Sequence, residues 1–141
     1  MEGCCVAYEI AWEKSGVVKH FDGFVGAEEF IRAAELVTAS ERFDSLRYII
    51  KDFRNVSGTD ICEKTIAYVA ALHNGSAYTN QNIHIAFVTA DKTLATIAER
   101  IKEKILAGAH ELKIFATIEE AKVWVSSQSA THTRSSAYLR Y

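Results

Sequence analysis

Most of the side chains that could do chemistry lie in residues 46–63, which read LRYIIKDFRNVSGTDICE. Asp52 follows an apolar run and could act as a general base or as an acceptor for a ligand. It could equally accept hydrogen bonds from backbone amides of its own loop, which is the interpretation we favour. Arg54 in the same loop could hold an anion, or it could form a surface ion pair of little energetic value.

The end of this segment is explained by the start of a helix. Asp60 is predicted as the N-cap of the helix that follows, with Glu63 three residues later as its capping-box partner. Cys62 would lie in the first turn, where a helix N-terminus lowers the pKa of a thiol. No histidine lies nearby in sequence to complete a Cys/His pair, so we favour a half-buried packing cysteine over a nucleophile.

No motif of a known catalytic spacing occurs in the rest of the chain. The sequence contains no GxGxxG, no P-loop and no GxSxG, and its 3 cysteines and 5 histidines lack zinc-like spacing. We therefore expect no cofactor, no metal and no enzymatic activity. An enzyme that uses Cys62 with Asp52 or a distant histidine is kept as a less favoured hypothesis.

Composition limits the class of protein. The chain has 141 residues, 49% of them hydrophobic and 24% charged, which suits one ordinary globular domain. Its net charge of −2 argues against nucleic-acid binding, because that requires a surplus of Lys and Arg. The first ten residues, MEGCCVAYEI, lack the features of a secretory signal, so we expect a cytoplasmic protein with reduced thiols.

Hydrophobic periodicity predicts alternating strands and helices. After an N-terminal hairpin, each strand is followed by one helix, which implies parallel crossovers. The fold class is therefore α/β, with a mostly parallel five-stranded sheet, an antiparallel N-terminal edge strand and four flanking helices. The expected strands are 6–12, 17–21, 46–52, 83–89 and 111–116, and the expected helices are 27–39, 60–73, 92–107 and 118–126.

The C-terminal segment differs in composition from the rest. Residues 128–141 are rich in Ser and Thr and show no periodicity, so we expect a domain over 1–127 and a flexible tail over 128–141. Thr117 and Glu120 are predicted to form a capping box before the last helix. The scattered histidines are interpreted as ordinary surface or core residues.

The carboxyl ends of parallel strands are where ligands bind in open α/β sheets. Here the loops 22–26 and 52–60 lie at such ends, and we expect a ligand between the helices and the sheet near Phe24, Phe53 and Tyr68. The helix over 92–107 carries Arg100 and Lys104 among acidic residues. A solvated face is the default interpretation, with weak contact to an anionic membrane as the alternative.

Three stretches resemble a known family: FDGFVGAEEF, YIIKDFRNVSGTD and IFATIEEAKVWV. Together they make residues 6–126 similar to the SpoIIAA-like proteins, relatives of the STAS domain and of Sec14-type lipid carriers. In STAS domains, a strand ends in Asp and an Asp-Ser-Ser-Gly sequence opens the next helix, with its first Ser phosphorylated by a kinase. This chain reads DICE at residues 60–63, so Ile61 occupies the acceptor position and the phosphorylation switch is not carried over.

The resemblance implies a regulatory or binding module. We expect it to bind a protein partner or a small apolar or lipid-like ligand, with a homodimer as a further option. The candidate ligand-binding residues are Phe24, Asp52, Phe53, Arg54 and Tyr68. The alternative is a STAS-type anti-sigma-factor antagonist regulated by phosphorylation at Ser57 or Thr59, which lie near Ile61.

Overall fold

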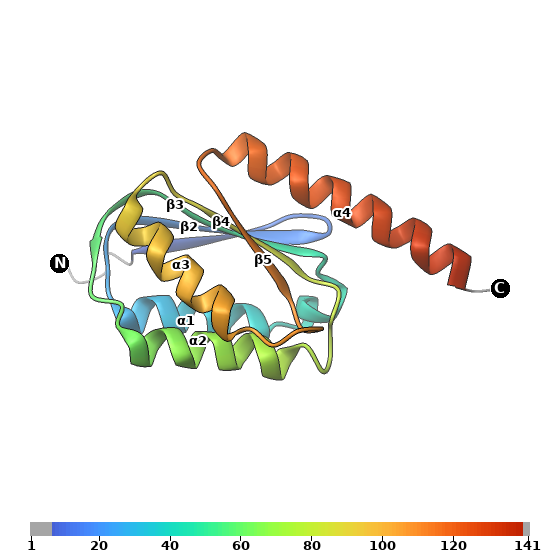
Figure 1. Cartoon of the computed structure of the whole chain (residues 1–141), viewed down its shortest axis with the longest axis horizontal. Helices are drawn as coiled ribbons and strands as arrows, with labels where there is room; N and C mark the ends of the chain where they lie inside the picture. Colours follow the sequence, from blue (N-terminus) through green and yellow to red (C-terminus); the bar gives the residue numbers. More distant parts are fainter. Residues whose placement is uncertain (1–6, 140–141) are drawn as a thin grey trace.

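The computed structural model of the protein describes the backbone of residues 7–139 and the side-chain environments of residues 7–128. Strands and helices follow one another in the expected order (Figure 1). The elements are β1 Tyr8–Trp12, β2 Gly16–Val25, α1 Ala27–Thr38, the 3-10 helix η2 Glu41–Ser45, β3 Tyr48–Thr59, α2 Glu63–Ser76, β4 His84–Val88, α3 Lys92–Lys104, β5 Glu111–Phe115 and α4 Ile118–Leu139.

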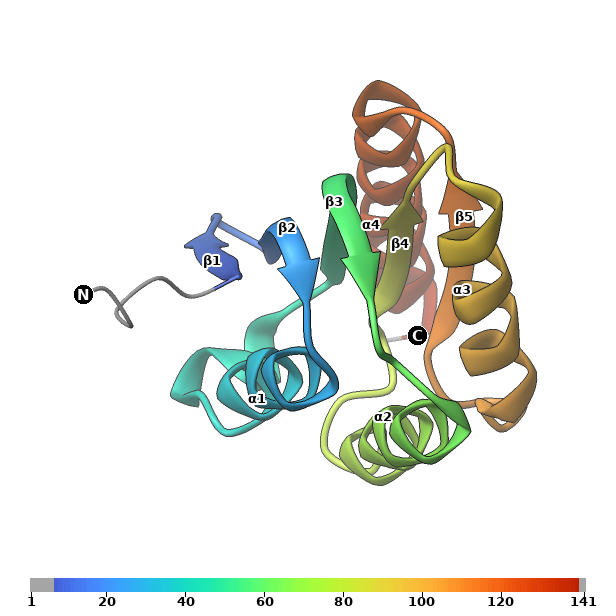
Figure 2. The ribbon, with the colours of Figure 1, turned by 90° about the vertical axis from the view of Figure 1, so that its left-hand side faces the viewer.

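The five strands form one sheet in the order β1-β2-β3-β4-β5. Strand β1 pairs antiparallel with β2, and the other three pairings are parallel. Helices α1, α2 and α3 cover one face of the sheet, and α4 lies on the other (Figure 2). The predicted fold class is therefore confirmed, including the antiparallel edge strand at the N-terminus.

Alternation along the strands divides the core into two layers. On the face toward α1, α2 and α3, buried aromatic rings pack together, with Phe53 between Phe21 at 4.6 Å and Phe87 at 4.5 Å between ring centroids. The opposite layer, under α4, is smaller and contains Ile50 and Val125. The buried stripe predicted for α1 is confirmed, and consists of Phe30, Ala33, Ala34 and Val37.

Strands β2 and β3 extend further than expected, over residues that the sequence pattern assigns to loops. Asp22 pairs with Asn55, Phe24 with Gly58 and Val25 with Thr59, and the register shifts twice along this stretch. Each shift inserts an extra residue into β3, which interrupts the two-residue alternation that identifies a strand. The expected loops 22–26 and 52–60 are therefore mostly strand.

Helix boundaries also differ from the expected ones. Helix α2 begins at Glu63 and continues to Ser76, through the Asn-Gly-Ser sequence expected to end it. Helix α3 ends at Lys104, and Gly108 adopts a φ of 87° in the turn that follows.

Helix α4 begins with the predicted capping contact, since the Glu120 N–H donates to Thr117 Oγ1 over 3.2 Å. It continues to Leu139, well beyond the expected end at residue 126. The division into a domain over 1–127 and a tail over 128–141 stays a prediction, and residues 140 and 141 lie outside the described part. No helix within the described residues has the length and apolarity needed to span a bilayer.

Candidate functional site

Strands β2 and β3 end side by side, and each leads directly into a helix. Val25 and Thr59 are register partners, and the Thr59 hydroxyl donates to the Val25 carbonyl oxygen over 2.6 Å. The same hydroxyl accepts from the Ile61 N–H at 3.1 Å. Thr59 therefore links the two strand ends by a side-chain hydrogen bond, and both the donor and the acceptor of its hydroxyl are used within the structure.

Asp60 caps helix α1, which precedes it in sequence by more than twenty residues. Its Oδ1 accepts from the Ala27 N–H at 2.6 Å, and the Gly26 N–H donates to Glu29 Oε1 at 2.8 Å. The prediction that Asp60 caps α2 is wrong, because the paired strand ends place its carboxylate beside the unsatisfied amides of α1. Glu63, its expected partner in a capping box, forms an ion pair with Arg100 of α3 instead.

Cys62 occupies the N-cap position of α2, where no side-chain cap hydrogen bond is formed among the described residues. Its side chain is exposed, so the expectation of a half-buried packing cysteine is wrong. The thiol lies 3.5 Å from Thr65 Oγ1. That contact, together with backbone N–H groups of the first helical turn, lowers the pKa of the Cys62 thiol. Its neighbour is a hydroxyl and not a histidine, which does not make a Cys/His nucleophile pair.

Phe24 lies at the end of β2 with 58% of its surface exposed. Its ring rests on Gly58 of β3, and a Cβ added at Gly58 would lie 3.5 Å from the ring. On the other side of this part of β3, an open hollow of about 270 Å³ is lined by residues 56–59 and by Asp91, Thr93 and Leu94. Ser57 is exposed at this hollow. The edge therefore presents an apolar ring and a polar hollow side by side.

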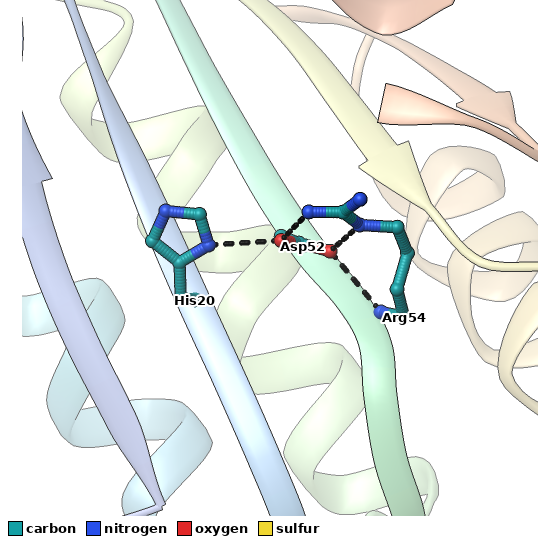
Figure 3. Close-up of polar contacts among 3 residues, drawn as sticks. All are labelled: His20, Asp52 and Arg54. Atoms are coloured by element: carbon teal, nitrogen blue, oxygen red, sulfur yellow. Dashed lines mark hydrogen bonds and ion pairs between the residues drawn. The ribbon is translucent and has the colours of Figure 1, made fainter. Parts of the chain in front are cut away.

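Asp52 lies within β3, on the same sheet face as Ile50 and α4, and its side chain is buried. Figure 3 shows its carboxylate between His20 and Arg54. His20 Nδ1 donates to Oδ2 at 2.8 Å. The Arg54 guanidinium donates to both carboxylate oxygens at 2.9 Å, and the Arg54 backbone N–H donates to Oδ1 at 3.1 Å. The favoured interpretation, that Asp52 accepts from the backbone nearby, is confirmed, whereas its placement at a strand end is wrong.

These contacts decide what Asp52 can do. Burial by itself would raise the pKa of Asp52, but the hydrogen bonds from Arg54 and His20 outweigh burial and hold it below its ordinary value. The carboxylate is thus ionised and surrounded by donors, which leaves it poorly suited to act as a general base. The guanidinium of Arg54 is neutralised by the same contact. The contact falls within the first register shift of β3, which lies between Asp52 and Asn55.

His20 is the member of this group that faces solvent. With Nδ1 donating to Asp52, the neutral ring keeps Nε2 as a hydrogen-bond acceptor. The side chain is 42% exposed and lines an open hollow of about 440 Å³ together with Glu9, Asp22 and Asn55. Sequence analysis did not connect His20 with Asp52, because the two residues are 32 positions apart and only the strand register makes them neighbours.

Phe24, Phe53 and Tyr68 do not come together around a ligand site. Phe53 is fully buried in the aromatic core, where its neighbours fill the space around it. Tyr68 is 44% exposed on α2, and its hydroxyl donates to Glu35 Oε2 on α1 at 2.6 Å. A role for these residues in ligand binding stays a prediction.

A group of buried bases was missed by the sequence analysis. Lys19, Lys51, His73 and His110 are all buried on the sheet face toward α1 and α2. A signal was present, since the alternation in VVKHF and YIIKDF places each lysine on the same face as large apolar neighbours. Within the described residues, no three histidine, cysteine or acidic side chains are grouped as a metal site would require.

A five-stranded mixed sheet of this order, with helices on both faces, is the α/β fold of SpoIIAA-like (STAS) domains. Among solved structures, the anti-sigma factor antagonist SpoIIAA in its unphosphorylated form matches with a TM-score of 0.57. The match covers 86% of this chain and 97% of that chain at 14% identity, so the likeness is one of fold. No protein-family model matches the sequence, and no curated protein matches it either.

Proposed function

We propose that the protein is a non-enzymatic regulatory module that binds a protein partner at the edge where β2 and β3 end. The observation that carries this proposal is Phe24, a large apolar ring that is 58% exposed and rests on Gly58, which also lines the hollow. Aromatic side chains in such positions are frequent anchors of protein interfaces. The edge also offers polar contacts, because α2 begins without a side-chain cap in the described structure.

The state of the polar groups favours binding over catalysis. Asp52 is saturated by four hydrogen bonds, and the hydrogen-bond partner of Cys62 is the Thr65 hydroxyl. Neither arrangement activates a nucleophile in the way that a positioned base would. The similar fold of an anti-sigma factor antagonist is in line with a regulatory role for this chain.

Photo-crosslinking tests the proposed edge. A benzoyl-phenylalanine at position 24 is compared with one at position 78, where Tyr78 is 93% exposed on the connection that follows α2. In cells of the source organism, we expect position 24 to give a protein adduct of defined mass that position 78 does not give. Excess wild-type protein should suppress the adduct, and excess Phe24→Ser should not. Identical adduct patterns at both positions would reject this edge as the docking site.

A second candidate is regulation by phosphorylation in the same region, and the structure distinguishes its two acceptors. Ser57 is exposed at the hollow, whereas the Thr59 hydroxyl is engaged by Val25 and Ile61. Incubation with a cognate kinase should therefore add one phosphate that Ser57→Ala removes and Thr59→Val retains. Phosphate confined to other residues, or no phosphate, would rule this candidate out.

Other uses of the fold have less support. An apolar or lipid-like ligand would be detected by native mass spectrometry of the purified protein, and a homodimer would be detected in the same spectrum.

Weak contact with anionic membranes would involve the basic face of α3, but Arg100 on that helix is paired with Glu63. We expect the module to act in the cytoplasm.

A further inference from the structure

A chain of three buried bases connects the sheet to α2 and to the segment that enters β5. Lys51 Nζ lies 3.1 Å from His73 Nε2, and His73 Nδ1 lies 3.0 Å from His110 Nδ1. The chain ends where His110 Nε2 meets the Asn80 carbonyl oxygen at 2.8 Å. All three side chains are buried, so each of these hydrogen bonds is sheltered from water.

The carbonyl at the end of the chain sets the position of every proton. A carbonyl oxygen only accepts, so His110 must carry its proton on Nε2. Neutral His110 then has a lone pair on Nδ1, which accepts from the N–H on Nδ1 of His73. This leaves His73 Nε2 as the acceptor for the Lys51 amine. With both rings neutral, no other choice of tautomers makes all three hydrogen bonds.

The effect of an added proton on these hydrogen bonds depends on which base takes it up. A proton on the Lys51 amine keeps every bond, because an ammonium group still donates to His73 Nε2. A proton on His110 Nδ1 instead brings two N–H groups face to face across 3.0 Å, so the bond between the histidines is lost. It also adds a positive charge beside groups that already repel it.

Apart from Glu111, which pairs with His84, the groups that surround the three bases are basic or apolar. Lys19 approaches from β2, and the ring of Phe30 on α1 lies 5.4 Å from Lys51 Nζ. Near His110, the ring of Phe43 comes from η2, and His84 of β4 forms an ion pair with Glu111 of β5 at 3.4 Å. No carboxylate bonds to the three bases in the part of the chain described.

His110 lies beside a hollow that is open to water. It lines an open hollow of about 290 Å³ whose wall also includes Lys102, Glu111 and Lys113. Burial lowers the pKa of both histidines, and lowers that of His73 further, while the Asn80 carbonyl partly offsets the effect at His110. The hollow therefore offers a proton a route to His110.

We propose that the hydrogen bond between His73 and His110 is an acid-operated latch between the end of α2 and residues 107–110. The latch is closed while His110 Nδ1 is unprotonated. It opens when that nitrogen takes a proton from the hollow, which frees residues 107–110 from α2 and exposes the hollow further. The Asn74 side chain of α2 keeps its hydrogen bonds to the Lys104 carbonyl oxygen and the Leu106 N–H, so residues 104–106 stay in place. The sheet and α1 do not take part, so the change is local.

Nuclear magnetic resonance of the full chain with ¹⁵N-labelled histidine tests the latch. At pH 8 we expect His110 protonated on Nε2 and His73 protonated on Nδ1. As the pH falls, hydrogen-exchange protection in residues 107–110 should drop roughly tenfold or more, and the midpoint of this drop should coincide with the midpoint of the His110 titration. Protection in β3 and β4 should persist, which separates opening of the latch from global unfolding.

His110→Gln supplies a matched variant, because its amide can donate to Asn80 and accept from His73 without titrating. We expect this variant to lose the acid step in protection, and the control His20→Gln to keep it. A proton on His110 Nδ1 at pH 8, or a His110 titration without loss of protection, would overturn the proposal. So would an acid step that survives in His110→Gln. If that variant does not fold, the measurements on the wild-type chain decide by themselves.

Discussion

Lys19 and Lys51 are register partners on β2 and β3, and both amine-bearing side chains are buried on the same face of the sheet. Lys19 forms no hydrogen bond or ion pair among the residues that the structure describes. Burial lowers the pKa of Lys19 to about 7. Because these two adjacent buried amines have no carboxylate partner, the free energy of unfolding should increase as the pH rises above 7.

We predict that the free energy of unfolding increases as the pH rises from 7 to 9.5. Because Lys19 has a lower pKa in the folded state than its ordinary 10.5, folding favours the deprotonated amine. The stabilisation is fully present above the ordinary pKa and is lost as the pH falls toward 7. The gain over this window should be on the order of a few kcal/mol, measured by urea denaturation at several pH values.

Lys19→Met should flatten this dependence and stabilise the protein at pH 7 by about 1 to 3 kcal/mol, since an apolar side chain replaces a buried amine. Lys14→Met, at an exposed residue of the β1–β2 turn, is the control and should leave the slope unchanged. Equal slopes in wild type and Lys19→Met would show that Lys19 does not cause the dependence. Tyr48 sets the upper end of this pH range. Burial and its hydrogen bond to Glu13 raise the pKa of its phenol in the folded state, so its contribution to stability is lost as the pH rises above the ordinary value of 10.0.

Asp60→Ala should destabilise the protein by about 1 kcal/mol, the usual effect of losing a helix N-cap acceptor. The loss should appear in α1, because the carboxylate bonds to the Ala27 N–H. Hydrogen exchange would show reduced protection in the first turn of α1 and little change in α2. Asp60→Asn, which keeps an acceptor oxygen, should recover most of the stability. Loss confined to the first turn of α2 would contradict this assignment.

Asp52→Ala should destabilise the protein by about 1 to 2 kcal/mol, since the hydrogen bonds from Arg54 and His20 to a buried carboxylate are lost, while both partners are partly exposed and become solvated instead. Asp52→Asn should also flatten the acid limb of the stability profile. The pKa of Asp52 is lower in the folded state, so its contribution is present above the ordinary value of 3.8 and is lost as the pH falls below it. Asp44→Asn, at an exposed residue, should leave that limb unchanged, and equal acid limbs in all three proteins would refute the role of Asp52.

Cys62 should react with iodoacetamide at pH 7 a few times faster than a free cysteine peptide, because its thiol is exposed and its pKa is lowered. The rate is measured in a background where Cys4 and Cys5 are replaced by Ser. Thr65→Val removes the hydroxyl that contacts the thiol and should return the rate to that of the peptide. A Cys62 no faster than the peptide in the parent background would mean that this contact does not activate it.

The fold could be predicted well from the sequence, whereas the candidate site could be predicted only in part. Elements with an unbroken period, such as the stripe of α1 and the apolar run of β4, appeared where expected. The extended ends of β2 and β3 did not, because two shifts of register break the alternation. Asp52 was identified as a structural acceptor, but its partner His20 depends on a pairing between distant strands.

The sequence by itself determined the class of fold, because hydrophobic period and strand order are local properties that add up along the chain. Only the tertiary structure decided which helix Asp60 caps and which bases share the interior. These outcomes depend on strand register, since it brings residues from distant parts of the chain within hydrogen-bonding distance. Burial then fixes the charge state of each group, because the energetic cost of a buried charge depends on everything packed around it.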